Sequence, residues 1–153
     1  MNILVLGALS HLGVNFIRKY SQYFKNVIAL DKVSYCSQSK EIISRHVTKF
    51  IELDISDADL ENIVVFHSIN LILNTAASTH VDRSYTHFNE FIHDNVNCVS
   101  ALMDTMVSLK KLNYQVKVIH LSTDEVYGDN YETVRFESDM LNPTNPYSSF
   151  KGS

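Results

Sequence analysis

Glycine, proline, cysteine and tryptophan are all scarce in this chain. Its 153 residues include four glycines, two prolines, two cysteines and no tryptophan. Glycine and proline together make up about 4% of the chain where roughly 12% is usual, which excludes collagen-like, linker-like and proline-rich disordered classes. The hydrophobic fraction of 45% is instead that of an ordinary globular chain that buries a core.

Positive charge and long apolar runs are also missing. The formal net charge is −4 and the pI about 5.9, which disfavours nucleic acid and anionic membrane surfaces as partners. Cys36 and Cys98 form no CxxC pair, which is typical of a reducing compartment. No stretch approaches the roughly 18 apolar residues of a membrane span, and residues 2–6 lack the basic segment of a signal peptide. We therefore expect a cytoplasmic protein.

Short apolar runs alternate with amphipathic segments along the chain. There are five such runs, at Ile3–Leu6, Val27–Leu30, Phe50–Leu53, Leu71–Leu73 and Val116–Leu121. Continuous apolar runs are typical of strands buried on both faces of a parallel sheet. Helical periodicity separates them, at about 12–23, 57–66 and 88–109. This alternation predicts an α/β fold with a doubly wound parallel sheet. A polar loop is expected at 129–145, with a further helix starting at its end.

The first apolar run leads into two of the four glycines. Gly7 and Gly13 have the outer spacing of G-x-x-G-x-x-G, with Ser10 in the place of the middle glycine. Such a turn lets the backbone approach a pyrophosphate at a helix N-terminus. The Cβ of Ser10 makes close approach harder, although its hydroxyl could donate to a phosphate. The alternative is a tight strand–helix turn with no ligand.

Carboxylates follow the second and third runs. Asp31 stands 18 residues after Gly13, where a carboxylate can accept both ribose hydroxyls of an adenosine and repel a 2′-phosphate, favouring NAD over NADP. Asp54-Ile55 follows the third run in the equivalent place. The alternative for Asp54 is a helix N-cap.

Tyr147 and Lys151 follow the long loop. On a helix they stand at i and i+4 and share a face. A nearby ammonium would lower the pKa of the tyrosine, so that the pair could act as a base near neutral pH. Thr123 could hydrogen-bond the substrate hydroxyl from which this base would take a proton. The alternative is an exposed surface pair.

Asp124 and Glu125 are adjacent carboxylates after the fifth run. Doubly wound folds bind ligands at this end of their strands. Two close carboxylates push their pKa values apart, which suits one for acid and the other for base duty. The alternative is a solvated acidic turn.

Together these motifs resemble the extended short-chain dehydrogenase/reductases, and within them the nucleotide-sugar 4,6-dehydratases that act on dTDP-glucose or UDP-glucose. The most specific part is the Thr123-Asp124-Glu125 triplet. The residues that carry the resemblance are Gly7, Gly13, Asp31-Lys32, Asp54-Ile55, Ala76–Ser84, Asn95, Ser122–Gly128, Tyr147 and Lys151.

The resemblance implies an NAD-binding Rossmann-like domain over residues 1–153 that lacks the C-terminal strands and substrate domain of the family. It also implies a set of cofactor contacts, drawn from Gly7, Ser10, His11, Leu12, Gly13, Asp31, Lys32, Val33, Ser34, Asp54, Ile55, Thr75, Ala76, Ala77, Tyr147 and Lys151. The sugar nucleotide would lie near four residues, Thr79, Thr123, Asp124 and Glu125. Relatives dimerise through the helix at 88–109.

The chemistry implied is an internal redox dehydration. Tyr147, with Lys151 and Thr123, would take the C4 hydroxyl proton as hydride passes to NAD. Glu125 would then remove the C5 proton while Asp124 protonates the departing C6 hydroxyl. The product is a 4-keto-6-deoxy sugar nucleotide. Without the substrate domain, we expect residues 1–153 alone to be inactive or weak.

The chain departs from the family pattern at five residues, Ser10, His11, Ser78, Asp94 and Cys98. Asp94 stands where threonine is usual and Cys98 where glycine is usual. These departures leave open a non-catalytic NAD-binding relative, or an epimerase-type member of the same superfamily. A metalloprotein is not expected, because Glu90-x-x-His93 occurs only once. Nucleophilic hydrolysis is not expected either, because no G-x-S-x-G elbow is present.

Overall fold

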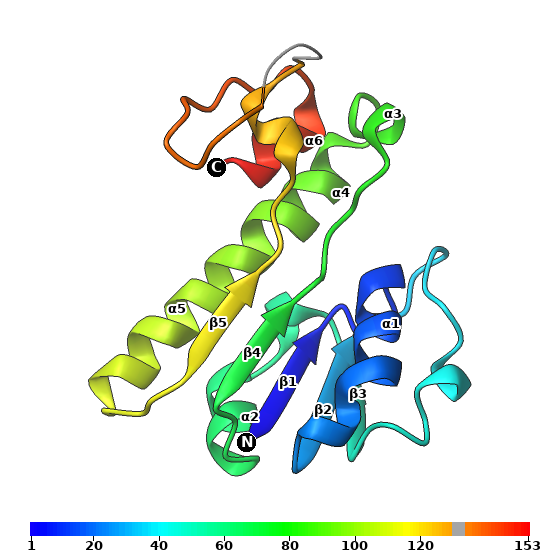
Figure 1. Ribbon diagram of the computed structural model, residues 1–153, viewed down its shortest axis with the longest axis vertical. Coiled ribbons are helices and arrows are strands. Elements are labelled where there is room, and N and C mark those ends of the chain that lie inside the picture. Colours follow the sequence, from blue (N-terminus) through cyan, green and yellow to red (C-terminus); the bar gives the residue numbers. More distant parts are fainter. Residues whose placement is uncertain (130–133) are drawn as a thin grey trace. The chain divides into compact units, whose positions relative to one another are not determined.

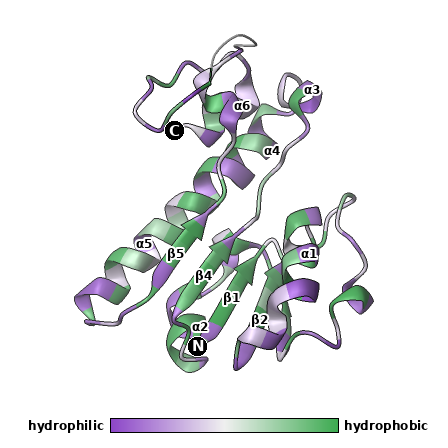
Figure 2. Cartoon of the chain, viewed as in Figure 1, coloured by the Kyte–Doolittle hydropathy of each residue, from purple (hydrophilic) through white to green (hydrophobic). Residues whose placement is uncertain are grey.

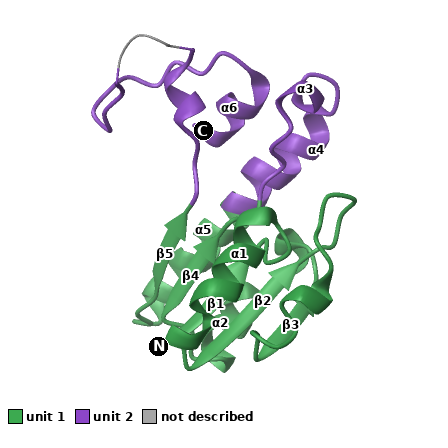
Figure 3. Ribbon diagram, turned by 45° about the vertical axis from the view of Figure 1, so that its right-hand side comes forward, with its two compact units in different colours: residues 1–76, 100–120 green, residues 77–99, 121–153 purple. Residues whose placement is uncertain are grey.

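A computed structural model describes residues 1–129 and 134–153 of the chain (Figure 1). The chain forms two compact units, which Figure 3 colours separately. Residues 1–76 and 100–120 form the first, here called the sheet unit. Residues 77–99 and 121–153 form the second, here called the helical unit.

The sheet unit is built on five parallel strands. They are β1 (Asn2–Leu6), β2 (Asn26–Asp31), β3 (Lys49–Glu52), β4 (Leu71–Asn74) and β5 (Lys117–His120). Their order in the sheet is β3-β2-β1-β4-β5, and all four pairings are parallel. The order runs outward in both directions from β1, so the predicted doubly wound parallel sheet is confirmed.

Helices cover both faces of this sheet. On one face, Ile3 and Val5 of β1 pack in a cluster with Val14 and Ile17 of helix α1 (His11–Tyr20). Since side chains alternate along a strand, Leu4 points to the opposite face. There helix α2 (Leu60–Phe66) and helix α5 (Cys98–Lys111) are joined by a hydrogen bond from Ser108 to Glu61. Figure 2 shows the central strands as continuous hydrophobic ribbons.

The edge strands depart from the expectation of burial on both faces. β1 and β2 are buried through their central residues, but every side chain of β3 and β5 is exposed or half-buried. Each edge strand pairs with a neighbour on one side only. The prediction of full burial is therefore wrong for the two edge strands.

Capping side chains set the helix ends. The predicted helix at 12–23 ends at Tyr20 and continues as a 3₁₀ turn, η1 (Ser21–Tyr23). The predicted helix at 57–66 begins only at Leu60, because Asp59 accepts the Asn62 amide as its N-cap. Before it lies a separate 3₁₀ turn, η3 (Ile55–Asp57), and η2 (Lys40–Ile42) precedes β3.

Besides a π turn, the described residues of the helical unit form four short elements and the start of a longer helix. The short ones are α3 (Val81–Ser84), α4 (Phe88–Ile92), η5 (Asp124–Tyr127) and α6 (Pro146–Lys151). The predicted long helix at 88–109 is interrupted by a π turn, η4 (His93–Asn97), before α5 begins. No helix or strand occurs at 129 or 134–145, as expected for the loop; residues 130–133 lie outside the described part. Among the described helices, none has the length and apolar character needed to cross a bilayer.

Candidate functional site

The turn after β1 requires both of its glycines. Gly7 has a φ of +71°, and a Cβ there would lie 2.5 Å from the Ala76 nitrogen. A Cβ on Gly13 would meet the carbonyl oxygen of Gly7 and the backbone of Ala8. Any larger residue would push the strand, the turn and the helix apart. The turn is therefore close-packed, as the dinucleotide-binding interpretation expects.

Ser10 sits in this turn without strain. Its φ is −64°, a value open to any L residue, so position 10 does not demand glycine. Its hydroxyl accepts the Gly13 amide at 3.0 Å as the N-cap of α1, and lies 3.1 Å from Oγ1 of Thr75. Thr75 in turn reaches the carbonyls of Leu6 and Gly7, each at 2.9 Å. The hydroxyl thus serves the fold, and its contact with a phosphate stays a prediction.

Asp31 organises the end of β2. One carboxylate oxygen accepts the Leu9 amide at 2.9 Å, and the other accepts the Val33 amide at 3.0 Å. Val33 has a φ of +52°, which is rare for a β-branched residue. Such strain costs of order 1–3 kcal/mol and persists where the surroundings fix the backbone. Here the hydrogen bond from the Val33 amide to Asp31 fixes the backbone. The next residue, Ser34, donates its amide to Ser37 Oγ at 2.9 Å.

Each carboxylate oxygen of Asp54 makes a contact that supports the fold. Oδ1 accepts the Ser56 amide at 2.9 Å, which makes Asp54 the N-cap of η3. Oδ2 lies 3.5 Å from Nζ of Lys32. The N-cap alternative is therefore confirmed, while Lys32 joins the ends of β2 and β3. Ile55, the next residue, is buried.

The remaining predicted contacts lie at strand and helix ends. His11 and Leu12 open α1, and the Leu12 side chain is exposed. Ala76 follows β4 and donates its amide to Asn74 Oδ1 at 3.1 Å. In the helical unit, Ala77 is half-buried and Thr79 exposed.

Tyr147 and Lys151 share the short helix α6. Their exposed fractions are 7% and 9%, so the alternative of an exposed surface pair is wrong. Asn145 starts the helix through a capping box with Ser148, and Pro146 occupies its first position. The Tyr147 amide donates to Oγ of Ser84 at 3.2 Å, which ties α6 to α3.

The electrostatics of this pair differ from the sequence expectation. Burial raises the pKa of Tyr147 above its usual value; a hydrogen bond with Thr123 lowers it, and the charges of Glu125 and Asp124 raise it further. Burial also lowers the pKa of Lys151, whose Nζ donates to the Leu121 carbonyl at 2.6 Å. The predicted lowering of the tyrosine pKa by Lys151 is therefore wrong for the chain without ligands, because desolvation dominates.

The acidic pair lies on η5. Thr123 caps this turn by accepting the Glu125 amide at 3.3 Å. The two carboxylates differ in setting: Asp124 is exposed, whereas Glu125 is half-buried and accepts Nδ2 of Asn145 at 2.9 Å. The solvated-turn alternative therefore describes Asp124 and fails for Glu125. η5 ends at Gly128, whose φ of +83° favours glycine.

Two residues of this site, Ser84 and Asn145, received no role from the sequence. Ser84 has a zero exposed fraction and receives the Tyr147 amide. The side chain of Asn145 both caps α6 and donates a hydrogen bond to Glu125. The Asn-Pro pair at 145–146 is a known helix-start signal and could have identified the cap. Nothing local in the sequence indicates the role of Ser84.

Comparison with known proteins gives close matches to nucleotide-sugar enzymes. A trifunctional UDP-glucose 4,6-dehydratase/UDP-4-keto-6-deoxy-D-glucose 3,5-epimerase/UDP-4-keto-L-rhamnose-reductase of Arabidopsis thaliana is 38% identical over 98% of this chain and 23% of its own. The Homo sapiens dTDP-D-glucose 4,6-dehydratase is 36% identical over 93% of this chain and 40% of its own. Both of these relatives are thus much longer than this chain.

Solved structures agree with these matches. DesIV, a dTDP-glucose 4,6-dehydratase from Streptomyces venezuelae solved with NAD bound, has a TM-score of 0.85 and 29% identity. The match covers 99% of this chain and 48% of DesIV. The family described as "NAD dependent epimerase/dehydratase family" matches residues 3–152. The chain therefore belongs to the NAD-dependent epimerase/dehydratase family.

Proposed function

We propose that this chain carries the NAD-binding portion and the acid–base residues of a nucleotide-sugar 4,6-dehydratase, a lyase of deoxysugar biosynthesis. The observation that carries the proposal lies in the helical unit. Asp124 and Glu125 lie on η5, which Thr123 caps, and Tyr147 and Lys151 lie on α6. Asn145 connects the two elements, since it caps α6 and holds Glu125.

The residues of the sheet unit fit a dinucleotide. The turn leaves no room for a side chain at Gly7 or Gly13, and Ser10 takes the Gly13 amide. The first-turn amides of His11 and Leu12 then remain as donors for a phosphate. Asp31 lies at the end of β2, where a ribose is expected. When bound, NAD would accept a hydride from the sugar and return it, so that no cofactor is consumed.

Tyr147 is proposed to take the proton of the C4 hydroxyl. Its hydrogen bond with Thr123 already favours the ionised form, against the desolvation that raises its pKa. Lys151, one turn along α6, is buried with a lowered pKa, and would hold the ribose and the tyrosine oxygen in place. Oxidation at C4 makes the C5 hydrogen acidic.

Glu125 and Asp124 are proposed to share the elimination. Glu125, positioned by Asn145, would remove the C5 proton. Asp124, exposed on the same turn, would protonate the departing C6 hydroxyl. Their unequal settings suit this division of base and acid.

The chain spans under half the length of the relatives and structures compared, so the activity and substrate of a whole enzyme are part of the proposal. The nucleotide is dTDP or UDP, and the substrate a nucleotide-diphospho-glucose. We also propose an NAD-binding Rossmann-like domain over residues 1–153, a cytoplasmic location and a homodimer through residues 88–109.

The cofactor proposal is tested by calorimetric titration with NAD and by mass spectrometry of the purified chain for retained NAD. Asp31→Ala should weaken binding by tenfold or more, whereas Asp57→Ala, at an exposed residue of η3, should not. No heat at millimolar NAD would reject the cofactor assignment.

The chemistry is tested in a chimaera that joins this chain to the C-terminal half of the human dehydratase. With dTDP-glucose it should form 4-keto-6-deoxy product, and Glu125→Gln should abolish that product while leaving NAD binding intact. Appearance of the C4 epimer instead would favour an epimerase. A folded, NAD-binding chimaera with no turnover would favour a non-catalytic relative. We expect no turnover by the 153 residues alone.

A further inference from the structure

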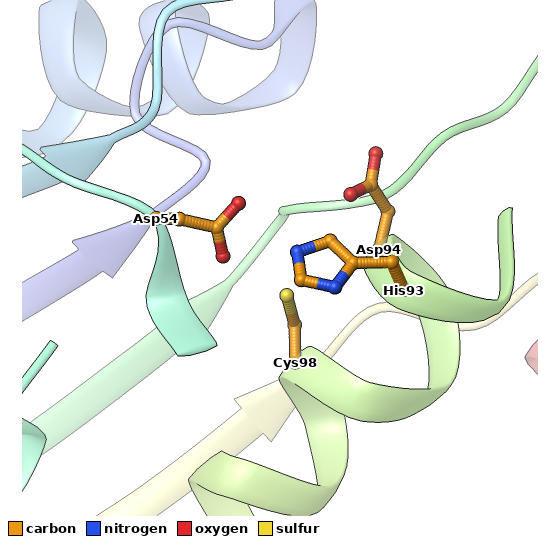
Figure 4. A group of neighbouring side chains, drawn as sticks. All are labelled: Asp54, His93, Asp94 and Cys98. Atoms are coloured by element: carbon orange, nitrogen blue, oxygen red, sulfur yellow. The ribbon is translucent and has the colours of Figure 1, made fainter. Parts of the chain in front are cut away.

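Three side chains of the helical unit form a nitrogen–oxygen–sulfur cluster. His93, Asp94 and Cys98 each offer one ligand atom, and these atoms all lie within 4.8 Å of one another (Figure 4). Asp54, also drawn there, belongs to the sheet unit. The proposed acid–base chemistry uses none of the three.

The π turn brings the cluster together. In η4 the Cys98 amide donates to the His93 carbonyl, five residues back. This longer turn places His93 and Cys98 one above the other, whereas a regular α-helix would stack residues four apart. Asp94 stands four residues before Cys98. π turns of this kind are frequently found at functional sites.

Cys98 of the cluster is buried, and Asp94 is held by a hydrogen bond. Cys98 is 5% exposed, whereas His93 and Asp94 are half-buried. Oδ2 of Asp94 accepts the Ser78 hydroxyl at 2.6 Å. Ser78 is itself fixed, because its amide and carbonyl both bond the Asn95 side chain, at 3.1 and 3.0 Å. Hydrogen bonds of this kind orient carboxylate ligands in metal sites.

The chemistry of the three donors selects a class of ion. Thiolate and imidazole prefer borderline or soft divalent metals, and a carboxylate completes sets that bind Zn²⁺. Hard ions such as Ca²⁺ and Mg²⁺ prefer oxygen ligands alone. Asp94 and Cys98 are also two of the residues at which this chain departs from the pattern it resembles.

We propose that His93, Asp94 and Cys98 bind a divalent transition metal ion, Zn²⁺ by ligand preference, with the remaining coordination position open. The ion would join the π turn η4, which carries His93 and Asp94, to Cys98 at the start of α5. Binding would release the thiol proton of Cys98, since the thiolate is the ligand.

Co²⁺ tests this site, because thiolate–Co²⁺ coordination gives a charge-transfer absorption band in the near ultraviolet. The reduced 153-residue chain should show the band on titration, and Zn²⁺ should displace it. Cys98→Ser should abolish the band. Cys36→Ser is the matched control, because Cys36 is the other cysteine and is exposed, and it should leave the band unchanged.

Two further variants keep the test independent of Cys98. His93→Gln should weaken Zn²⁺ binding in calorimetry, and Ser78→Ala, which removes the hydroxyl that donates to Asp94, should weaken it roughly tenfold. Absence of the band at millimolar Co²⁺, or a band that survives Cys98→Ser, would overturn the proposal. Since neither NAD nor a sugar is used, these outcomes are independent of the proposed function.

Discussion

The two units of the chain are held together in different ways. The sheet unit buries apolar side chains on both faces of its central strands, with Ile3, Leu4 and Ile28 fully enclosed. The helical unit depends more on buried polar groups, among them Ser84, Ser148 and Lys151, that bond to neighbouring main chain. Apolar burial is tolerant of detail, whereas hydrogen bonds require particular atoms in particular places. Removing a single buried polar group should therefore disturb the helical unit and leave the sheet unit intact.

The largest effect is expected from the apolar core. Ile3→Ala removes a fully buried side chain from β1 and should lower the free energy of unfolding by about 2–5 kcal/mol, through lost burial and a cavity. Urea unfolding followed by circular dichroism measures the change. Val65→Ala on α2, where the side chain is 43% exposed, should change it far less. Equal losses would contradict this account of the sheet unit.

Ser84→Ala should disrupt the helical unit selectively. The variant removes the hydroxyl that donates to Val81 at 2.6 Å and accepts the Tyr147 amide at 3.2 Å. A buried amide left without its partner costs about 1–3 kcal/mol. Hydrogen exchange should therefore accelerate at Tyr147 and leave β1 amides unchanged. Ser149→Ala, at an exposed serine of α6, is the control; uniform acceleration across both units would contradict the comparison.

Losing the cap of α6 should lower stability by a smaller amount. A conservative substitution at Asn145 separates the cap from the contact with Glu125. Asn145→Ala loses both the cap and the contact with Glu125, and should cost about 0.5–2 kcal/mol. Asn145→Ser keeps an oxygen for the Ser148 amide, so its cost should be a few tenths of a kcal/mol by the same scale. Exchange at Ser148 reports the cap. If serine were as damaging as alanine, the contact with Glu125 would matter more than the cap.

The smallest effect is the pH dependence that Tyr147 contributes. Because its folded-state pKa is raised, folding favours the neutral phenol. Its contribution to stability is therefore complete below the unfolded-state pKa of about 10, and is lost as pH rises through the higher folded-state pKa. Alkaline absorbance titration, with Tyr147→Phe subtracted, should show this tyrosine ionising above pH 10. Tyr23→Phe, at a side chain 72% exposed, is the control; ionisation of Tyr147 near neutral pH would contradict the prediction.

Sequence prediction succeeded where one physical pattern dominates. Apolar runs located all five strands, and Gly7 and Gly13 identified a turn that the backbone does require. It failed where tertiary contacts decide. The π turn at 93–97 leaves no mark on the apolar spacing, and the pKa of Tyr147 depends on burial that i, i+4 spacing does not reveal. Ser84 is remote from α6 in sequence, so only folding shows its contact.

The hydroxyl of Ser10 has a consequence for how cofactor binding and folding are linked. With the Gly13 amide already bonded, the first turn of α1 is ordered before any phosphate arrives, and little binding free energy is spent on ordering it. Ser10→Gly should lower the melting temperature of the ligand-free chain slightly, and a fixed concentration of NAD should raise it by less than in the parent chain, because binding must then also order the turn. The serine thus transfers part of the stability of this turn from the ligand to the protein.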